Sequence, residues 1–163
     1  MIRDATAIDI AYVVEHLRDD DRIELFGLMP SDDGDELVRL ALAWNGRRWV
    51  CASDDAPHMP VAVGGVSSPR AGVWVAWAFG TDQFARHARE ITEHCRGVVE
   101  QLEASGAVHR LEAVSWAGHT SAHRWLRRHL GFVQEATLRR YGRTGEDYII
   151  FTRSPAGAPQ QEG

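Results

Sequence analysis

The segment from residue 119 to residue 132, HTSAHRWLRRHLGF, holds the side chains best suited to chemistry. His119 and His123 are about one helical turn apart, and imidazole is the side chain that exchanges protons near neutral pH. Thr120 and Ser121 are good helix-capping residues, so the alternative is a capped helix that begins with two surface imidazoles. The sequence leaves open whether this helix start serves catalysis or only structure.

Other common kinds of catalytic and metal site lack their sequence patterns. Cys51 and Cys95 stand alone, without a CxxC motif or a His/Cys cluster at zinc spacing, so we expect neither a disulfide nor a metal site. Cys95 falls on an apolar helix stripe and is expected to pack in the interior, not to act as a nucleophile. The sequence has no GxSxG motif, and a serine hydrolase therefore has no support.

Composition and charge narrow the function classes further. A chain of 163 residues with 44% hydrophobic residues suits a single domain with a real core. The net charge of -5 argues against general nucleic-acid binding. The beginning of the sequence lacks an apolar run of signal length, and no stretch approaches the roughly 20 apolar residues of a membrane span. We expect a soluble, cytoplasmic protein that does not bind nucleic acid and does not span a membrane.

The spacing of apolar residues predicts the elements that position these side chains. Residues 1–5 predict a short strand, and Thr6 with Asp9 resembles a capping box at a helix start. The segment DDDR, 19–22, is expected to be a solvated turn. A second helix is predicted over residues 32–46. Its apolar side is formed by Leu37, Leu40, Ala41 and Trp44.

The spacing then changes from helical to strand-like. Three short segments rich in valine and tryptophan, separated by turn residues, predict an antiparallel meander over residues 47–53, 60–68 and 72–80. Both faces of the third segment are apolar, so it is expected to be central and covered on both sides. Four tryptophans are expected in the core. They are Trp74, Trp77, Trp116 and Trp125.

The helical spacing returns after residue 80. A stripe predicts a long helix over about residues 88–102. The stripe consists of Ala88, Ile91, Cys95, Val98 and Leu102. A strand is predicted over 110–116, and the helix of the opening segment is expected to stop at Gly131 in a left-handed cap. The last expected elements are two strands, over 132–142 and 147–153, and a flexible tail over 154–163.

The predicted order is β-α-α-β-β-β-α-β-α-β-β, in a single domain over residues 1–153. The fold class is α/β (α+β), with a mixed, mostly antiparallel central sheet and helices on both faces. This order resembles the GNAT superfamily of N-acetyltransferases over nearly the whole chain. The strongest local likeness is the helix end Leu130-Gly131-Phe132, followed by a strand with Glu135. The ending LRRYGRTGEDYIIFTR also looks like that of phage and prophage GNAT-like proteins, including relatives of the internal virion protein of T7-like phages.

The resemblance implies a coenzyme A site at the head of the long helix. The family's pattern there is Gln/Arg-x-x-Gly-x-Gly/Ala, whose backbone N–H groups cradle the pyrophosphate. In this register Gln83 and Ala88 match the pattern, while Arg86 replaces the middle glycine. A side chain at this position crowds the phosphate, although the guanidinium could itself contact it. The full set that the resemblance assigns to the cofactor is Trp77, Ala78, Phe79, Gln83, Phe84, Ala85, Arg86, His87, Ala88, Thr120 and Arg127.

The resemblance also implies catalytic positions, from which this sequence departs. The family's asparagine before the helix falls on Thr120, and its tyrosine general acid falls on Arg127, which cannot donate a proton near neutral pH. His119 or His123 could substitute as the proton donor. No carboxylate of the fourth strand stands out as a general base, although a water relay could serve instead. Trp44 and Trp49 are candidates for the acceptor cleft.

Two functions follow from the resemblance. The first is an acyltransferase that moves an acetyl group from acetyl-CoA to a small-molecule or protein amine. The second is a non-catalytic GNAT-fold phage or prophage protein with a degenerate cofactor site, a virion component or assembly factor that binds phage structural proteins. A homodimer formed through the C-terminal strands is a further expectation. If the protein is phage-encoded, the virion is its expected location.

Overall fold

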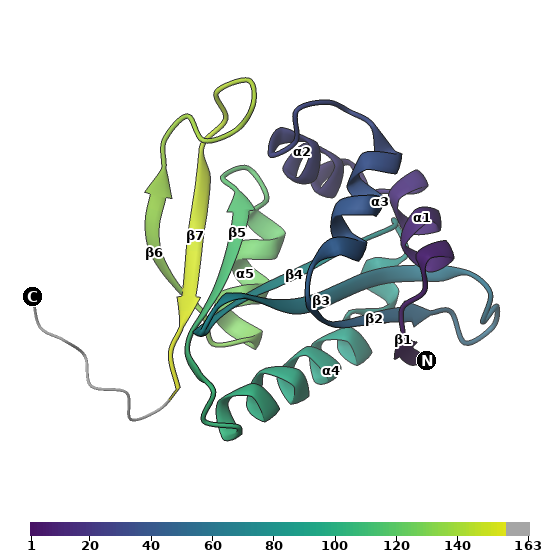
Figure 1. Cartoon of the computed structure of the whole chain (residues 1–163). Coiled ribbons are helices and arrows are strands. Elements are labelled where there is room, and N and C mark those ends of the chain that lie inside the picture. The colour runs from purple at the N-terminus through teal and green to yellow at the C-terminus, as the bar shows by residue number, and fades with distance from the viewer. Residues whose placement is uncertain (156–163) are drawn as a thin grey trace, which may run out of the picture.

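The computed structural model describes residues 1–155, which form seven strands and five helices in one sheet-based fold (Figure 1). The strands are β1 (Ile2–Asp4), β2 (Gly46–Ala52), β3 (Pro60–Arg70), β4 (Gly72–Gly80), β5 (Val108–Trp116), β6 (Val133–Leu138) and β7 (Tyr148–Arg153). The helices are α1 (Ala7–Glu15), α2 (Asp19–Gly27), α3 (Gly34–Ala43), α4 (Phe84–Ala104) and α5 (Thr120–His129). Of the predicted tail, residues 156–163 lie outside the described residues.

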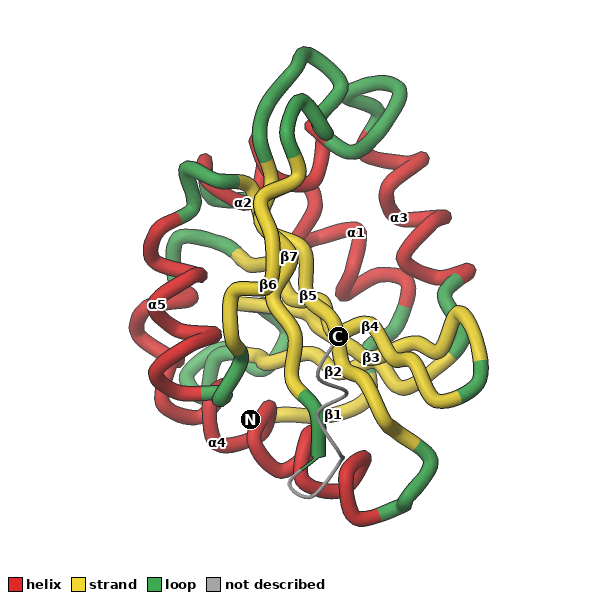
Figure 2. The backbone as a smooth tube through the Cα atoms, turned by 90° about the vertical axis from the view of Figure 1, so that its left-hand side faces the viewer, coloured by secondary structure: helices red, strands yellow, loops and turns green. Residues whose placement is uncertain are grey.

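The sheet has the predicted mixed, mostly antiparallel architecture. Its strand order is β1-β2-β3-β4-β5-β7-β6, and only β4 and β5 run parallel to each other. The meander β2-β3-β4 is confirmed, and β4 lies in the centre with neighbours on both sides. Helices α1 and α3 cover one face of the sheet, and α4 and α5 cover the other (Figure 2).

The expected turn at residues 19–22 was wrong, because this segment begins helix α2. The helix has no clear apolar stripe to reveal it in the sequence. Its first turn contains Asp19, Asp20 and Asp21, whose charges are favourable beside the positive end of the helix dipole. Asp21 is 1% exposed and bonded within the fold. The observed order therefore has three helices between β1 and β2, where two were predicted.

The core is divided by the sheet into two layers. One cluster joins α1 and α3 to the β4 side chains Phe79 and Trp77, and the other joins α4 and α5 to β5 and β7. Leu40, expected on the apolar side of α3, is instead 42% exposed. The four tryptophans expected in the core are half-buried, and two of them, Trp77 and Trp125, line a cavity described below.

Two predictions at helix ends are confirmed. Thr6 and Asp9 form a reciprocal capping box at the start of α1. Gly131 follows α5 with a φ of 71°, in the left-handed region that glycine adopts without strain. Cys51 and Cys95 are unpaired. None of the helices in the described part of the chain is both long and apolar enough to cross a membrane.

Candidate active site

The two parallel strands at the centre of the sheet separate before they end. Strand β4 pairs with β5 only from Gly72 to Val75, whose partners run from Val108 to Glu112. Beyond this point β4 continues along β3, while β5 continues along β7 from Ala113 onward. The sheet therefore opens between the second halves of β4 and β5.

Ala78 presents backbone groups to this opening. Backbone direction alternates along a strand, so Ala78 faces the same way as Gly80, two residues further on. The Gly80 N–H donates to Asp21 and its carbonyl accepts from the Arg18 N–H, which places both groups on the side away from β3. Because β5 has left β4 after Val75, the N–H and C=O of Ala78 have no strand partner on that side. The neighbouring Trp77 and Phe79 turn their backbone groups toward β3.

A cavity of about 240 Å³ passes through the opening. Its walls come from both sides of the sheet, with α2 and the end of α3 on one side and α4 and α5 on the other. The residues that contribute are Glu24, Leu25, Leu28, Trp44, Trp49, Gly65, Val66, Val75, Ala76, Trp77, Ala78, Phe79, Cys95, Val98, Val99, Ala113, Val114, Ser115, Ala122, Trp125, Leu126, Leu130 and Phe132. Among the described residues, Glu24 is the only one in this wall with a charged side chain.

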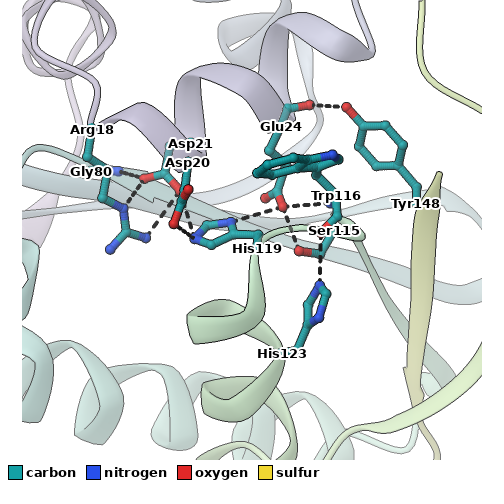
Figure 3. Close-up of polar contacts among 10 residues, drawn as sticks. All are labelled: Arg18, Asp20, Asp21, Glu24, Gly80, Ser115, Trp116, His119, His123 and Tyr148. Carbon is teal, nitrogen blue, oxygen red and sulfur yellow. Dashed lines mark hydrogen bonds and ion pairs between the residues drawn. The ribbon is translucent and has the colours of Figure 1, made fainter. Parts of the chain in front are cut away.

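Helix α2 spans the open ends of the two strands (Figure 3). On the β4 side, Asp21 accepts the Gly80 N–H at 2.7 Å. On the β5 side, Glu24 Oε2 accepts the Ser115 hydroxyl at 2.5 Å and the Trp116 N–H at 2.8 Å. The main chain of the same helix is also held, because the Tyr148 hydroxyl donates to the Glu24 carbonyl at 2.7 Å.

All hydrogen bonds found to the Glu24 carboxylate go to a single oxygen. Oε2 has Ser115, Trp116 and His119 Nδ1 as partners, the last at 3.1 Å. Oε1 has no partner among the described residues, and the side chain is 14% exposed and lines the cavity. Glu24 is therefore a carboxylate fixed through one oxygen, whose other oxygen has no partner among the described residues.

His119 is buried next to Glu24 and does not lie at the surface. Its side chain is 2% exposed, and Nε2 lies 3.8 Å from Asp21 and 4.0 Å from Asp20 without a hydrogen bond to a described residue. Burial alone would lower the pKa of His119, but the hydrogen bond and charge of Glu24, with the charge of Asp21, outweigh it and raise the pKa. In its protonated form, His119 places a positive charge between the two carboxylates that hold β4 and β5.

His123 is also buried, so the interpretation of both histidines as surface imidazoles was wrong. Its Nε2 lies 3.0 Å from the Trp116 carbonyl, and burial lowers its pKa. Neither His119 nor His123 lines the cavity. The start of α5 has no side-chain cap either: His119 is the N-cap residue, and the expected caps Thr120 and Ser121 are exposed.

Asp21 is held by charge as well as by the Gly80 amide. Burial raises the pKa of Asp21, and the Arg18 guanidinium opposes this with bonds of 2.7 and 3.1 Å. Arg18 also lies over the ring of Phe84, 4.2 Å from its centroid. This contact joins the beginning of α2 to the first residue of α4.

Some of the backbone N–H groups at the start of α4 already have hydrogen-bond partners within the same segment. Thr81 accepts the Gln83 N–H through its hydroxyl and the Phe84 N–H through its carbonyl, and the Arg86 N–H bonds to the Gln83 carbonyl at 3.0 Å. The Ala85 N–H has no partner among the described residues. The phosphate cradle expected at residues 83–88 thus offers fewer free amides than the family pattern implies, while the Arg86 side chain is exposed beside it.

The structure brings together only part of the predicted site. Trp77, Ala78 and Phe79 line the cavity, as do Trp44 and Trp49. The other predicted cofactor and catalytic residues lie outside its wall. They are Gln83, Phe84, Ala85, Arg86, His87, Ala88, Thr120, Arg127, His119 and His123. The sequence analysis missed Glu24 and Ser115, because Glu24 lies in the segment between the two predicted helices and no motif marks either residue.

Sequence spacing predicted no metal site, yet the fold brings together two sets of three possible ligands. In the set Asp21, Glu24 and His119, the carboxylates already bond to Arg18 and to backbone N–H groups. The other set is Cys51, His87 and Glu90. There, Glu90 pairs with the Met1 amino group at 2.8 Å, and burial raises the pKa of the Cys51 thiol to about 12. In both sets, part of the candidate ligand atoms is already engaged in ion pairs or hydrogen bonds with other described residues.

Comparison with solved structures finds proteins of similar fold. A phosphinothricin acetyltransferase of the GNAT superfamily from Sinorhizobium meliloti, solved in complex with AcCoA, is similar with a TM-score of 0.73 and 17% identity, over 100% of this chain and 94% of that one. The chain has the GNAT fold. No family model and no curated protein matches it in sequence.

Two other GNAT-fold structures are similar over almost their full length. The ribosomal-protein-alanine N-acetyltransferase from Brucella melitensis has a TM-score of 0.69 and 17% identity, over 94% of this chain and 99% of that one. A GNAT-family acetyltransferase from Streptococcus pneumoniae has a TM-score of 0.64 and 18% identity, over 94% and 98%. At these identities the likeness establishes the fold alone.

Proposed function

We propose that this protein is an N-acetyltransferase that moves an acetyl group from acetyl-CoA to an amine. The observation that carries the proposal is the opening between β4 and β5, where the free backbone of Ala78 and the free oxygen of Glu24 border one apolar cavity. An acetyl transfer needs a donor to the thioester carbonyl, a group that takes the amine proton, and a site that excludes water. The described residues offer all three.

The residues of the opening fit a bound coenzyme A. Its pantetheine arm carries amide groups, and Ala78 offers an N–H and a C=O that β5 leaves unpaired. The apolar walls suit the rest of the arm. At the head of α4, the Ala85 N–H and the exposed Arg86 guanidinium are the groups available to phosphate, since Phe84 and Arg86 use their own amides internally.

When bound, acetyl-CoA supplies an acetyl group activated as a thioester. The Ala78 N–H donates to a carbonyl oxygen in the opening and orients it. Glu24 Oε1 accepts a proton from the acceptor amine, while Ser115 and the Trp116 N–H hold Oε2 in place. His119 is a positioning residue, because its Nδ1 contacts Glu24 Oε2 while its own side chain does not line the cavity.

Three further expectations remain predictions. The three structures named above are acetyltransferases, and they lend no support to a phage or virion role. A homodimer through the C-terminal strands would use β6, which forms an edge of the described sheet and exposes Val133. The extent of the domain, residues 1–153, likewise stays a prediction.

The proposal is tested by calorimetry with acetyl-CoA, followed by assays of coenzyme A release and product mass with a panel of amines. We expect binding, turnover, and a kcat/KM that falls about a hundredfold in Glu24→Gln while the Kd for acetyl-CoA stays the same. Glu15→Gln, an exposed glutamate at the end of α1, is the matched control. No binding at millimolar acetyl-CoA, or full activity of Glu24→Gln, would overturn the proposal.

A further inference from the structure

The wall of the cavity also limits the kind of acceptor. We infer that the acceptor is a small amine with a single positive charge on an apolar body the size of an aromatic ring. This inference rests on the proposed function and adds the substrate class to it. The inference comes from the cavity wall opposite α4 and α5, which we call the acceptor side. This wall is formed by side chains of α2, the end of α3, and β4.

The acceptor side is aromatic and aliphatic. Trp44 and Trp77 lie with their ring centroids 5.0 Å apart and their planes at 58°. Leu25 of α2 and Leu28, the residue that follows α2, line the same wall. Gly65 of β3 makes room for Trp77, because a Cβ on Gly65 would lie 2.8 Å from the indole. Such a surface binds an apolar body by burying it, and the faces of indole rings also attract cations.

Glu24 gives this wall a single anchoring charge. Its free oxygen, Oε1, can hold one ammonium group, and no other lining residue in the described chain is charged. The carboxylate is fixed on its other oxygen by Ser115 and Trp116, so the position of the charge is set before a ligand arrives. One anchoring carboxylate among apolar side chains matches one ammonium on an apolar molecule.

The same wall disfavours other common acceptors. An amino acid brings a carboxylate, for which the described wall has no cation and which Glu24 repels. An amino sugar brings hydroxyl groups, and Ser115, whose hydroxyl is already bonded to Glu24, is the main polar side chain available to them. A polyamine brings a second charge that would be buried without a partner. Each of these mismatches leaves a buried polar or charged group unsatisfied, which weakens binding strongly.

The test compares acceptors that differ in one feature. The panel is 2-phenylethylamine, tryptamine, L-phenylalanine, glucosamine and spermidine, each assayed with the whole protein and acetyl-CoA. We expect the two aromatic monoamines to have a kcat/KM at least a hundredfold above the others. L-Phenylalanine is the sharpest comparison, because it is 2-phenylethylamine with an added carboxylate. Equal or better turnover of the amino acid, the sugar or the polyamine would overturn the inference and leave acetyl transfer itself intact.

A binding measurement keeps the inference testable if turnover is low. Calorimetry of the acetyl-CoA-loaded protein with 2-phenylethylamine should give a Kd at least tenfold below that of L-phenylalanine or of the uncharged 2-phenylethanol. Equal affinities for the three ligands would reject the substrate class. A protein that fails to bind acetyl-CoA would instead reject the proposed function, so the two failures are distinguishable.

A pair of variants tests the wall directly. Leu28 lines the cavity and is 45% exposed, while Leu40 on α3 is 42% exposed and lies outside the wall. Leu28→Lys should lower kcat/KM for 2-phenylethylamine at least tenfold, through charge repulsion and loss of an apolar contact, and should narrow its advantage over L-phenylalanine. Leu40→Lys should change neither. Unaltered selectivity in Leu28→Lys would show that Leu28, at the end of α2, does not contact the acceptor.

Discussion

Asp21 and Glu24 stand three residues apart on α2 and hold opposite strands of the opening, Asp21 through the Gly80 N–H and Glu24 through the Trp116 N–H. His119 lies between the two carboxylates. A parallel pair of strands that separates leaves backbone groups unpaired on both strands, which is unfavourable unless other groups bond to them. Helix α2 supplies these partners at the ends of the strands and leaves Ala78, deeper in the opening, free. The contacts that stabilise the open sheet therefore also define the site.

The first prediction concerns Asp21. Asp21→Asn keeps an oxygen for the Gly80 N–H but leaves the Arg18 guanidinium without its counter-charge in a mostly buried position. We expect the free energy of unfolding in urea to fall by about 3 kcal/mol, as for other broken buried ion pairs. Asp19→Asn, in the same first turn but exposed, is the control and should change it by less than about 0.5 kcal/mol. Equal stability of the two variants would contradict the role given to Asp21.

The second prediction is a pH dependence of stability from His119. Its folded-state pKa is raised above the ordinary 6.5, so the stabilisation is complete below pH 6.5 and is lost as the pH rises through the raised value. The groups that face the imidazole are Arg18, Asp20, Asp21, Glu24 and His123. We expect the unfolding free energy of the wild type to fall as the pH rises above 6.5, with a slope of at most about 1.4 kcal/mol per pH unit.

The variant His119→Gln isolates this effect. It should be less stable at pH 6 and should show a flatter profile, whereas His58→Gln, in an exposed loop, should follow the wild type. Urea unfolding at a series of pH values measures both. A wild-type profile that stays level or rises over this window would show that His119 does not gain stability from its charge.

The sheet and the long helix could be predicted because their buried residues recur at regular spacing in the sequence. Ile91 and Val98 recur at helical spacing and are buried against the sheet, and the apolar faces of residues 72–80 indicated a central strand. Gly131 marked the end of α5 because its conformation is one that other residues rarely adopt. In each case a local rule and the global fold require the same residue type.

The polar network could not be predicted in this way. Asp21 lies in a run of aspartates that is typical of a solvated turn, and only the distant Gly80 N–H and Arg18 explain its burial. Glu24 meets Ser115 across 91 residues of sequence. Contacts of this kind depend on which strands separate, and the amphipathic pattern of the sequence does not carry that information.

The third prediction tests whether the cavity holds the cofactor. Ala78→Leu adds three carbon atoms at the cavity wall, beside the buried cluster of Trp49, Phe84 and Ile91 against which Ala78 packs. We expect the Kd for acetyl-CoA to rise at least tenfold, and a thermal unfolding curve of the variant checks that it still folds, because overpacking can destabilise a protein. Ala11→Leu, at an exposed position of α1, should leave the Kd unchanged. Undiminished binding in Ala78→Leu would locate the cofactor outside the opening.

The fourth prediction decides between two roles of Arg86. The amides of Phe84 and Arg86 bond within the segment, so few backbone donors remain and the guanidinium is the stronger candidate for phosphate. Arg86→Ala should raise the Kd for acetyl-CoA about fivefold at low salt and less at 0.5 M salt, because added ions screen the contact. Arg39→Ala, exposed on α3, should have no effect. Tighter binding by Arg86→Ala would show instead that this side chain crowds the phosphate.

The fifth prediction compares two glycines in the layer that carries α4 and α5. Gly131 has a φ of 71°, and a Cβ there would lie 2.8 Å from Arg153 Nη1, whose guanidinium bonds to Glu103 and to the Leu130 carbonyl. Gly131→Val should lower the unfolding free energy by at least about 1 kcal/mol, through backbone strain and displacement of this arginine. Unchanged thermal unfolding would refute the left-handed cap.

A substitution at Gly97 should change the unfolding free energy in the opposite direction. It lies inside α4, and a Cβ added there would have no neighbour within 4 Å. Gly97→Ala should raise the unfolding free energy by up to about 1 kcal/mol, because alanine loses less backbone freedom than glycine in a helix. Urea unfolding of the two variants side by side tests both signs. A destabilised Gly97→Ala would mean that α4 packs more closely at this position than the structure has it.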